Sequence, residues 1–225
     1  MANKRSVFDM IGPIMIGPSS SHTAGVVRIA RAANRVLGGI PEEATITFFN
    51  SFARTFEGHG SDRAVLGGLM DFKTDDVRIK DALEIAKEKL VHYTFKSIGN
   101  SSVHHPNTIK LLLKKGDKQV EIFGESLGGG VINISEIDGF VANFSAQNHT
   151  LIIKAEDEPG SIAFISSVIA QEKVNIATMS VSRKGKHDMA CHVIEMDSGI
   201  NEITRQYLLS LPWIKELIYI PDIDL

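Results

Sequence analysis

The sequence has a single cysteine, Cys191, among its 225 residues. An iron–sulfur cluster is normally held by three or four thiolates, so this chain cannot hold one with its own cysteines. Cys191 lies in Met189–Ile194, an alternating segment that is typical of a β-strand. We therefore expect a thiol buried in a core rather than a metal ligand.

The sequence also has little net charge and no long apolar run. Its formal charge is -3, which gives no basic footprint for nucleic acid. Lys4 and Arg5 stand near the N-terminus without a following apolar segment, and no run approaches the ~18 apolar residues of a membrane span. These features exclude a signal peptide and a membrane helix and predict a cytoplasmic protein. Hydrophobic residues make up 43% of the chain, enough for packed cores in one or two domains.

What the sequence does have is a serine-rich run, Gly17–Gly25, directly before a predicted helix over Val26–Leu37. Serine is a favourable N-cap, and the free N–H groups of a first helical turn attract anions. A carboxylate or phosphate could be held there, with His22 beside it for proton transfer. The alternative is an ordinary Ser/Thr cap on a surface helix, and the run alone leaves both open.

Three further clusters carry polar residues between glycines or before a proline. In Glu57–Arg63 a histidine stands between two glycines, and Asp62 is predicted to cap a helix that ends near Met70. In His104–Thr108 a proline biases the preceding histidine towards an extended conformation. Ser126–Gly130 precedes an apolar strand. Each cluster alone is typical of a loop, but four together indicate loops that bind a small polar substrate.

In this order, the four segments resemble the beta subunit of the bacterial iron–sulfur-dependent L-serine dehydratase, whose pattern is G-P-S-S-S-H-T, G-H-G-T-D, H-P-N-T and S-I-G-G-G. Gly17–Thr23 and His105–Thr108 match it unchanged. Ser61 replaces the threonine of the second segment, and Leu127 replaces the isoleucine of the fourth. The resemblance extends over essentially the whole chain, because the region from about His149 is similar to an ACT domain.

The resemblance implies an enzyme subunit that converts L-serine to pyruvate and ammonia without pyridoxal phosphate. It implies a [4Fe–4S] cluster whose open iron acts as Lewis acid on the β-hydroxyl, while a histidine takes the α-proton. Since Cys191 is alone, the cluster is expected on an alpha subunit, and this chain is expected to supply no metal ligand.

The resemblance also assigns residues. His59 is the leading candidate for the base, with Asp62 holding its loop, and His22 orients substrate or transfers protons; the two histidines could exchange roles. The remaining expected contacts bind the serine carboxylate, contact the substrate or the partner, or let backbone amides approach: Ser19, Ser20, Ser21, Thr23, His105, Asn107, Gly128 and Gly129.

The predicted fold class is α+β, with a mixed substrate-binding domain over 1–146 and an ACT domain over 149–225. For the first domain we predict strands over 44–49, 93–98, 109–113, 120–123 and 131–137, helices over 62–70 and 79–92, and a polar linker over 143–148. The second domain is predicted as ferredoxin-like β-α-β-β-α-β, with strands over 151–155, 176–182, through Cys191 and 214–220 and helices from Pro159 and over 203–209. By resemblance, Gly160 and Asn175 face an amino-acid effector, and ACT sheets pair between subunits.

Two other classes of function stay open. One is a non-catalytic regulatory protein that senses amino acids, since the first domain also resembles an allosteric module of some 3-phosphoglycerate dehydrogenases. The other is a metal-dependent hydrolase built on His22, His59, Asp62, His104 and His105, although no H-x-x-x-H or C-x-x-C pair anchors such a site. Arg28 and Arg31 are interpreted as a solvated charged face of the first helix, or else as a partner contact.

Overall fold

The computed structural model describes residues 12–185 and 188–223. The chain divides into two compact units, Met1–Ser135 and Glu136–Leu225. This division lies earlier than the predicted boundary near residue 146. The predicted α+β class is confirmed, and each unit is described below by itself.

The first unit is built on a mixed sheet. The six-stranded sheet has the order β2-β1-β3-β4-β5-β6. The boundary between the two units, after Ser135, falls within β5. Strands β1 and β2 pair in parallel, so a crossover of helices joins them, whereas β1–β3 and β3–β4 are antiparallel. The strands are β1 (Glu43–Phe49), β2 (His92–Ile98), β3 (Thr108–Lys115), β4 (Lys118–Gly128), β5 (Val131–Ile137) and β6 (Phe140–Phe144), of which β6 belongs to the residues of the second unit.

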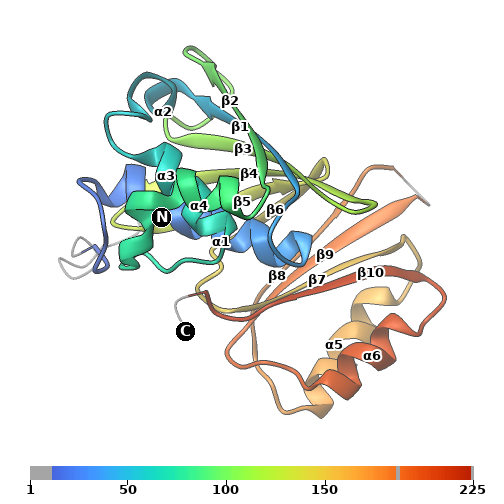
Figure 1. Cartoon of the computed structure of the whole chain (residues 1–225). Helices are drawn as coiled ribbons and strands as arrows, with labels where there is room; N and C mark the ends of the chain where they lie inside the picture. The colour runs from blue at the N-terminus through green and yellow to red at the C-terminus, as the bar shows by residue number, and fades with distance from the viewer. Residues whose placement is uncertain (1–11, 186–187, 224–225) are drawn as a thin grey trace. The chain divides into compact units, whose positions relative to one another are not determined.

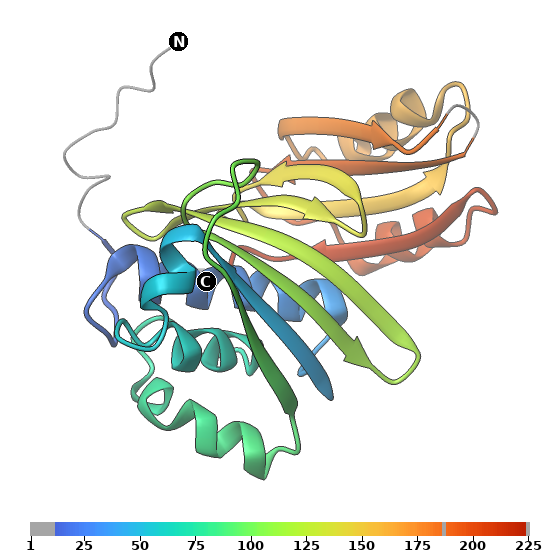
Figure 2. The ribbon, with the colours of Figure 1, turned by 90° about the horizontal axis from the view of Figure 1, so that it is seen from above.

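Helices cover one side of this sheet. Figures 1 and 2 show α1, α3 and α4 on the same side, with α1 against β3 and β4 and α3 packed on α1. The helices are α1 (Gly25–Leu37), α2 (Asn50–Thr55), α3 (Ser61–Leu69) and α4 (Ala82–Glu88), with a 3-10 turn η3 (Val77–Asp81) before α4.

Helix α1 forms where the apolar spacing predicted it, and it ends at a glycine. Gly38 adopts a left-handed φ of 90°, and its N–H donates to the Asn34 carbonyl at 2.9 Å. The interpretation of Arg31 as part of a solvated face is wrong. Its side chain is only 7% exposed and its Nε lies 3.1 Å from Asp71 Oδ1, because α1 is packed on nearly all sides.

The second unit has the predicted βαββαβ order, in a four-stranded antiparallel sheet ordered β10-β7-β9-β8. This is the ferredoxin-like fold expected of an ACT domain, and we call it the ACT-like unit. Both helices lie on one face of the sheet, and a core of residues such as Ile153, Ile169 and Ile194 fills the space between. Its elements are β7 (His149–Glu156), α5 (Ser161–Gln171), β8 (Ile176–Arg183), β9 (Met189–Met196), α6 (Glu202–Leu209) and β10 (Ile214–Ile220).

Cys191 is fully buried in β9, as predicted. Burial raises the pKa of its thiol to about 11. The predicted polar linker over 143–148 is partly wrong, because β6 includes Asn143 and Phe144. Helix α2 was not predicted, because it has only six residues and no amphipathic period.

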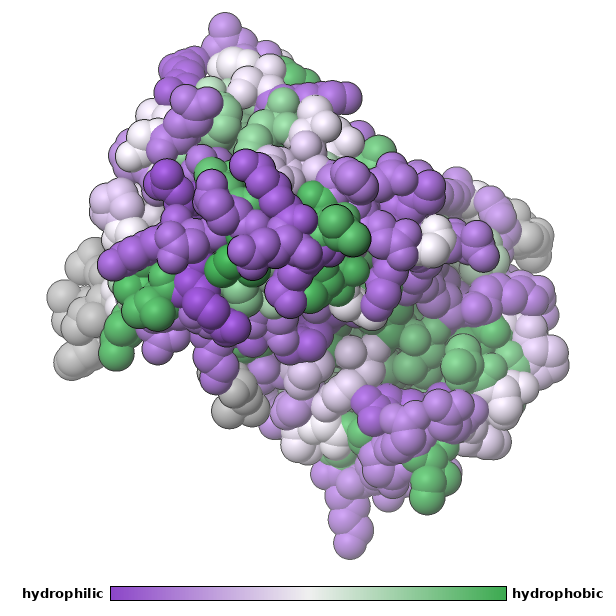
Figure 3. Space-filling view, in the orientation of Figure 1, coloured by the Kyte–Doolittle hydropathy of each residue, from purple (hydrophilic) through white to green (hydrophobic). Residues whose placement is uncertain are grey.

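In the space-filling view, the face towards the viewer is mostly hydrophilic, with hydrophobic residues in separate patches (Figure 3). Exposed hydrophobic side chains include Ile203, Tyr207 and Leu209 on α6. No helix among the described residues is long and apolar enough to cross a membrane.

Candidate active site

The serine-rich run does not form a simple cap. Ser20–Ala24 is a π-helical turn, η2, that leads directly into α1. Ser19 is its N-cap: the Ser19 Oγ accepts a hydrogen bond from the His22 N–H at 3.1 Å. Among the described residues, the hydroxyls of Ser20 and Ser21 have no hydrogen-bond partner. Single π turns are frequent at functional sites, and this one presents two free hydroxyls at the start of a helix.

His22 is half-buried, and its ring packs against two others. It contacts Phe52 edge-on, with ring centroids 4.9 Å apart. It also packs against His59 in a tilted arrangement, with ring centroids 4.7 Å apart. The His22 Nδ1 lies 3.3 Å from the Ser19 Oγ, while its Nε2 is buried without a partner in the described structure. Burial, and secondarily the charge of His59, lower the pKa of His22, which favours the neutral ring.

His59 is held through its backbone and its ring. Its N–H donates to the Thr55 carbonyl at 3.0 Å, and its Nδ1 lies 3.2 Å from the same oxygen. A carbonyl oxygen can only accept, so Nδ1 carries a proton, and in this tautomer of the ring the lone pair is on Nε2. A general base needs such a lone pair directed at its substrate.

Two side-chain hydrogen bonds join the serine-rich turn to the loop of His59. Thr23 Oγ1 donates to the His59 carbonyl at 3.1 Å, and Ser61 Oγ donates to the His22 carbonyl at 2.7 Å. Each loop thus fixes the backbone of the other loop's histidine. The structure therefore brings together the two histidines that the sequence singled out.

The glycine-rich segment lies beside the same turn. A Cβ on Gly128 would come within 3.8 Å of the Ser21 Oγ, and Gly128, Gly129 and Gly130 all have positive φ angles that favour glycine. Ser126, just before this segment, is fully buried, and a Cβ added to Gly25 would lie only 2.2 Å from its Oγ. Only glycine at position 25 allows the start of α1 to approach β4 this closely.

The loop of His104 and His105 joins the cluster through main-chain contacts. The Ser126 N–H donates to the Asn107 carbonyl at 3.0 Å, and the Asn107 N–H donates to His105 Nδ1 at 3.2 Å. Asn50 holds the loop, because its Nδ2 donates to the carbonyl of His104 at 3.2 Å. The ring of His104 stacks against Phe123, with ring centroids 5.3 Å apart.

Two residues outside the predicted set therefore position the histidines: Thr55 accepts from His59, and Asn50 holds the 101–105 loop. Both lie in α2, the helix that the sequence pattern did not predict. The sequence signal was a strand followed directly by asparagine, a residue that tolerates positive φ; Asn50 has φ 50°.

The prediction that Asp62 caps its helix is wrong. Gly60, with φ 68°, is the N-cap of α3, and Asp62 Oδ1 accepts from the Arg63 N–H at 2.8 Å. The loop of His59 is held by Thr23 and Thr55 instead. The catalytic role of Asp62 stays a prediction.

In the ACT-like unit, Gly160 lines a cavity of about 240 Å³ with Phe164 and Trp213. Asn175 is not part of it; its Nδ2 donates to Asp197 Oδ2 at 2.7 Å. Within one chain, the two predicted effector positions therefore do not share a cavity.

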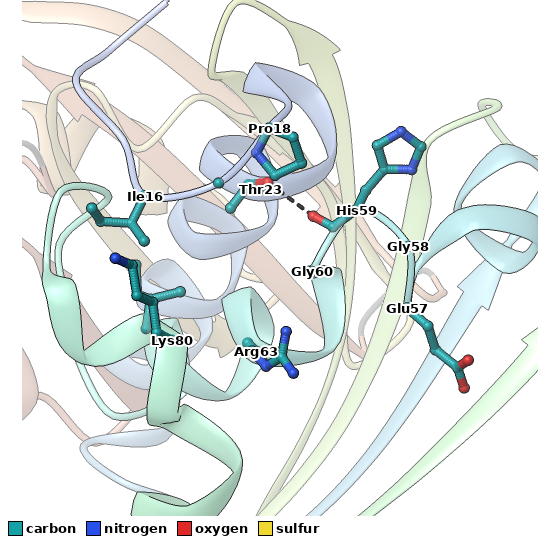
Figure 4. Close-up of a pocket in the computed structure, with 11 residues that line it drawn as sticks. Ile16, Pro18, Thr23, Glu57, Gly58, His59, Gly60, Arg63 and Lys80 are labelled. Carbon is teal, nitrogen blue, oxygen red and sulfur yellow. Dashed lines mark hydrogen bonds between the residues drawn. The ribbon is translucent and has the colours of Figure 1, made fainter.

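A second cavity, of about 270 Å³, lies between the Gly17–Pro18 turn and the loop of His59. Figure 4 shows Thr23 and Pro18 on one side of it and Arg63 and Lys80 on the other. The imidazole of His59 points away from this cavity (Figure 4). The cavity and the pair of histidine rings thus lie on opposite sides of the same loop.

This cluster of loops matches a known family. The family model for the serine dehydratase beta chain matches residues 6–119, and these include the serine-rich turn, the His59 loop and the His105 loop. The chain belongs to the serine dehydratase beta chain family.

Members of the serine dehydratase beta chain family match the chain over nearly its full length. The "Probable L-serine dehydratase, beta chain" of Bacillus subtilis is 41% identical, over 97% of this chain and 99% of that protein. The "L-serine dehydratase, beta chain" of Peptoniphilus asaccharolyticus is 32% identical, over 92% of this chain and 93% of that protein. A D-3-phosphoglycerate dehydrogenase of Methanocaldococcus jannaschii is 26% identical over 70% of this chain but only 30% of its own length.

The described residues of this beta chain do not fit an iron–sulfur cluster. Its only cysteine is fully buried in β9, and its raised pKa disfavours the thiolate that would bind iron. Among residues 12–185 and 188–223, no three His, Cys, Asp or Glu side chains come together as metal ligands. The five residues of the hydrolase hypothesis therefore do not form a metal site in this part of the chain.

Proposed function

We propose that this chain is the beta subunit of an iron–sulfur-dependent L-serine ammonia-lyase that forms pyruvate and ammonia together with a cluster-carrying alpha subunit. The observation that carries the proposal is the His22–His59 pair, built beside the free hydroxyls of a serine-rich turn. The "beta chain" in the names of both relatives supports a partner chain. Since this chain does not fit the cluster, the chemistry of hydroxide loss is assigned to the partner.

On this proposal, the serine-rich turn binds the substrate carboxylate. The hydroxyls of Ser20 and Ser21 donate to it, at the N-terminal end of η2 and α1 where N–H groups and the helix dipole favour an anion. The glycine segment beside Ser21 has no side chains there, so a ligand can approach its backbone. His105 and Asn107, joined to this segment through Ser126, contact substrate or the partner.

His59 takes the α-proton on Nε2, because Thr55 holds the proton of its Nδ1. His22 orients the substrate: the Ser19 hydroxyl can donate to its Nδ1, which leaves Nε2–H as a buried donor. Loss of the α-proton and of the β-hydroxyl converts serine to aminoacrylate and water. The aminoacrylate tautomerises to an imine, and addition of water to the imine releases pyruvate and ammonia.

The proposal is tested by anaerobic co-expression of this chain with a cysteine-bearing alpha chain, with pyruvate formation from L-serine as the assay. Activity in the pair and in neither chain alone supports it. In the pair, His59→Ala should lower kcat at least about 100-fold, as expected for loss of a general base. His92→Ala removes an exposed histidine at the start of β2 and is the matched control.

Assembly is measured in the same preparations by size-exclusion chromatography. His59→Ala should form the same complex as the unchanged chain, so that lost turnover reflects chemistry. Near-normal turnover would refute the assignment of the base. A stable complex without activity would favour the regulatory alternative, and the absence of any complex would refute the two-chain enzyme.

We further propose that residues 1–146 form the substrate-binding domain and 149–225 an ACT domain that pairs with a second copy. Gly160 and Asn175 would then face an effector from the two chains of the pair, which is consistent with their separation within one chain. Titration of the chain with L-serine in a calorimeter, with Gly160→Ala as the variant, tests effector binding. A variant that binds serine as tightly as the unchanged chain would contradict it.

A further inference from the structure

The cavity between the Gly17–Pro18 turn and the His59 loop is lined by two cationic side chains, those of Arg63 and Lys80. Within the described part of the chain, the side chains of Arg63 and Lys80 form no hydrogen bond or ion pair, and both residues are exposed. Glu57 also lines the cavity, but its carboxylate points away from both cations (Figure 4). The cavity is therefore electropositive and attracts anions.

Ile16, Pro18 and Ile79 form an apolar part of the wall, and Thr23 and the backbone around His59 complete it. The volume of about 270 Å³ lies just below the range of sites for drug-sized ligands. A bare inorganic anion would leave the apolar wall without contact. An amino acid would leave its ammonium group beside two cations.

We propose that this cavity is a second ligand site, which binds a small organic dicarboxylate. Its carboxylates pair with Arg63 and Lys80, and its carbon chain lies against the apolar wall. The binding claim does not rest on the proposed function, since the cavity lies wholly within this chain.

The position of the cavity gives its ligand a route to the histidine pair. Thr23 lines the cavity, and its Oγ1 donates to the His59 carbonyl at 3.1 Å. Gly58 and Gly60, on either side of His59, line it as well. A bound dicarboxylate therefore restrains the backbone that carries His59 from the side opposite its ring.

Isothermal titration calorimetry of the full chain tests the site, with succinate and butyrate as probes. Both have four carbons, but butyrate carries one carboxylate. Succinate should bind saturably, with a Kd of about millimolar, as expected for a ligand of this size at a partly open site. Butyrate should bind about tenfold more weakly, because it loses one of two charge-assisted contacts.

Arg63→Gln and Lys80→Gln should each weaken succinate binding about fivefold to tenfold. Lys87→Gln, which removes an exposed lysine of α4 outside the cavity, is the matched control and should leave the affinity unchanged. Succinate should also slow amide hydrogen exchange in residues 57–60 of the unchanged chain but not of Arg63→Gln.

Four results would overturn the proposal: no saturable binding of succinate, equal binding of succinate and butyrate, tighter binding of inorganic phosphate than of succinate, or undiminished binding in both glutamine variants. Binding without a change in exchange over 57–60 would refute the restraint of the His59 loop. Failure of the two-chain activity assay touches none of these results, so the two proposals fail separately.

Discussion

Gly68→Ala is expected to weaken the packing that sets the His22 turn against the His59 loop. The turn leads into α1 and the loop into α3, and the two helices approach closely at Gly68. A Cβ there would lie 2.4 Å from the Val27 carbonyl oxygen and 2.6 Å from the Ala30 Cβ. Both are parts of a packed helix that cannot rotate away.

The cost can be worked from two terms. Overpacking against backbone costs up to about 3 kcal/mol, whereas alanine gains about 1 kcal/mol over glycine in a helix interior. The expected net loss is about 2 kcal/mol in the free energy of unfolding. Gly67→Ala is the matched control, because it has the same helical gain but its Cβ meets side chains and no backbone: Ile79 at 3.2 Å, Phe72 at 3.4 Å and Ala82 at 3.9 Å.

Urea denaturation followed by circular dichroism measures both variants against the unchanged chain. The midpoint should fall for Gly68→Ala and stay close to that of the unchanged chain for Gly67→Ala. Equal midpoints for the two variants would refute the close approach of α1 and α3 at Gly68.

Two further predictions concern the ACT-like unit. His192 is 1% exposed with no hydrogen-bond partner for either ring nitrogen in the described structure, and burial lowers its pKa although Asp157 opposes this. Its contribution to stability is present above the unfolded pKa of about 6.5 and is lost as the pH falls below it. The free energy of unfolding should therefore fall less steeply between pH 7 and 5 in His192→Leu than in the unchanged chain, by up to about 1.4 kcal/mol per pH unit. The exposed control His92→Asn should leave this pH dependence unaltered. Parallel stability curves for His192→Leu and the unchanged chain would contradict the prediction. Cys191, with its pKa of about 11, should resist a thiol reagent at neutral pH in the native chain and react once the chain is unfolded in urea. Rapid labelling of Cys191 in the native chain would contradict its burial.

Much of the fold follows from local pattern. The apolar spacing of Val26–Leu37 predicts α1 to within one residue, and the Lys115–Lys118 turn places the β3–β4 hairpin. The sequence pattern did not predict α2 and β6 at all, and they are short segments of six and five residues. Such segments carry little periodicity, and contacts with distant residues determine them.

The sequence by itself determined the chemistry that this protein has available: a serine-rich helix start, histidines between glycines, and too few thiols to hold a cluster. Those are properties of residue type and spacing, which are local. Only the tertiary structure decided that His22 and His59 pack ring to ring, that Thr55 rather than Asp62 holds His59, and that Arg63 and Lys80 share a cavity behind them. Each of these relations depends on how helices and loops pack in three dimensions, and no local spacing encodes that.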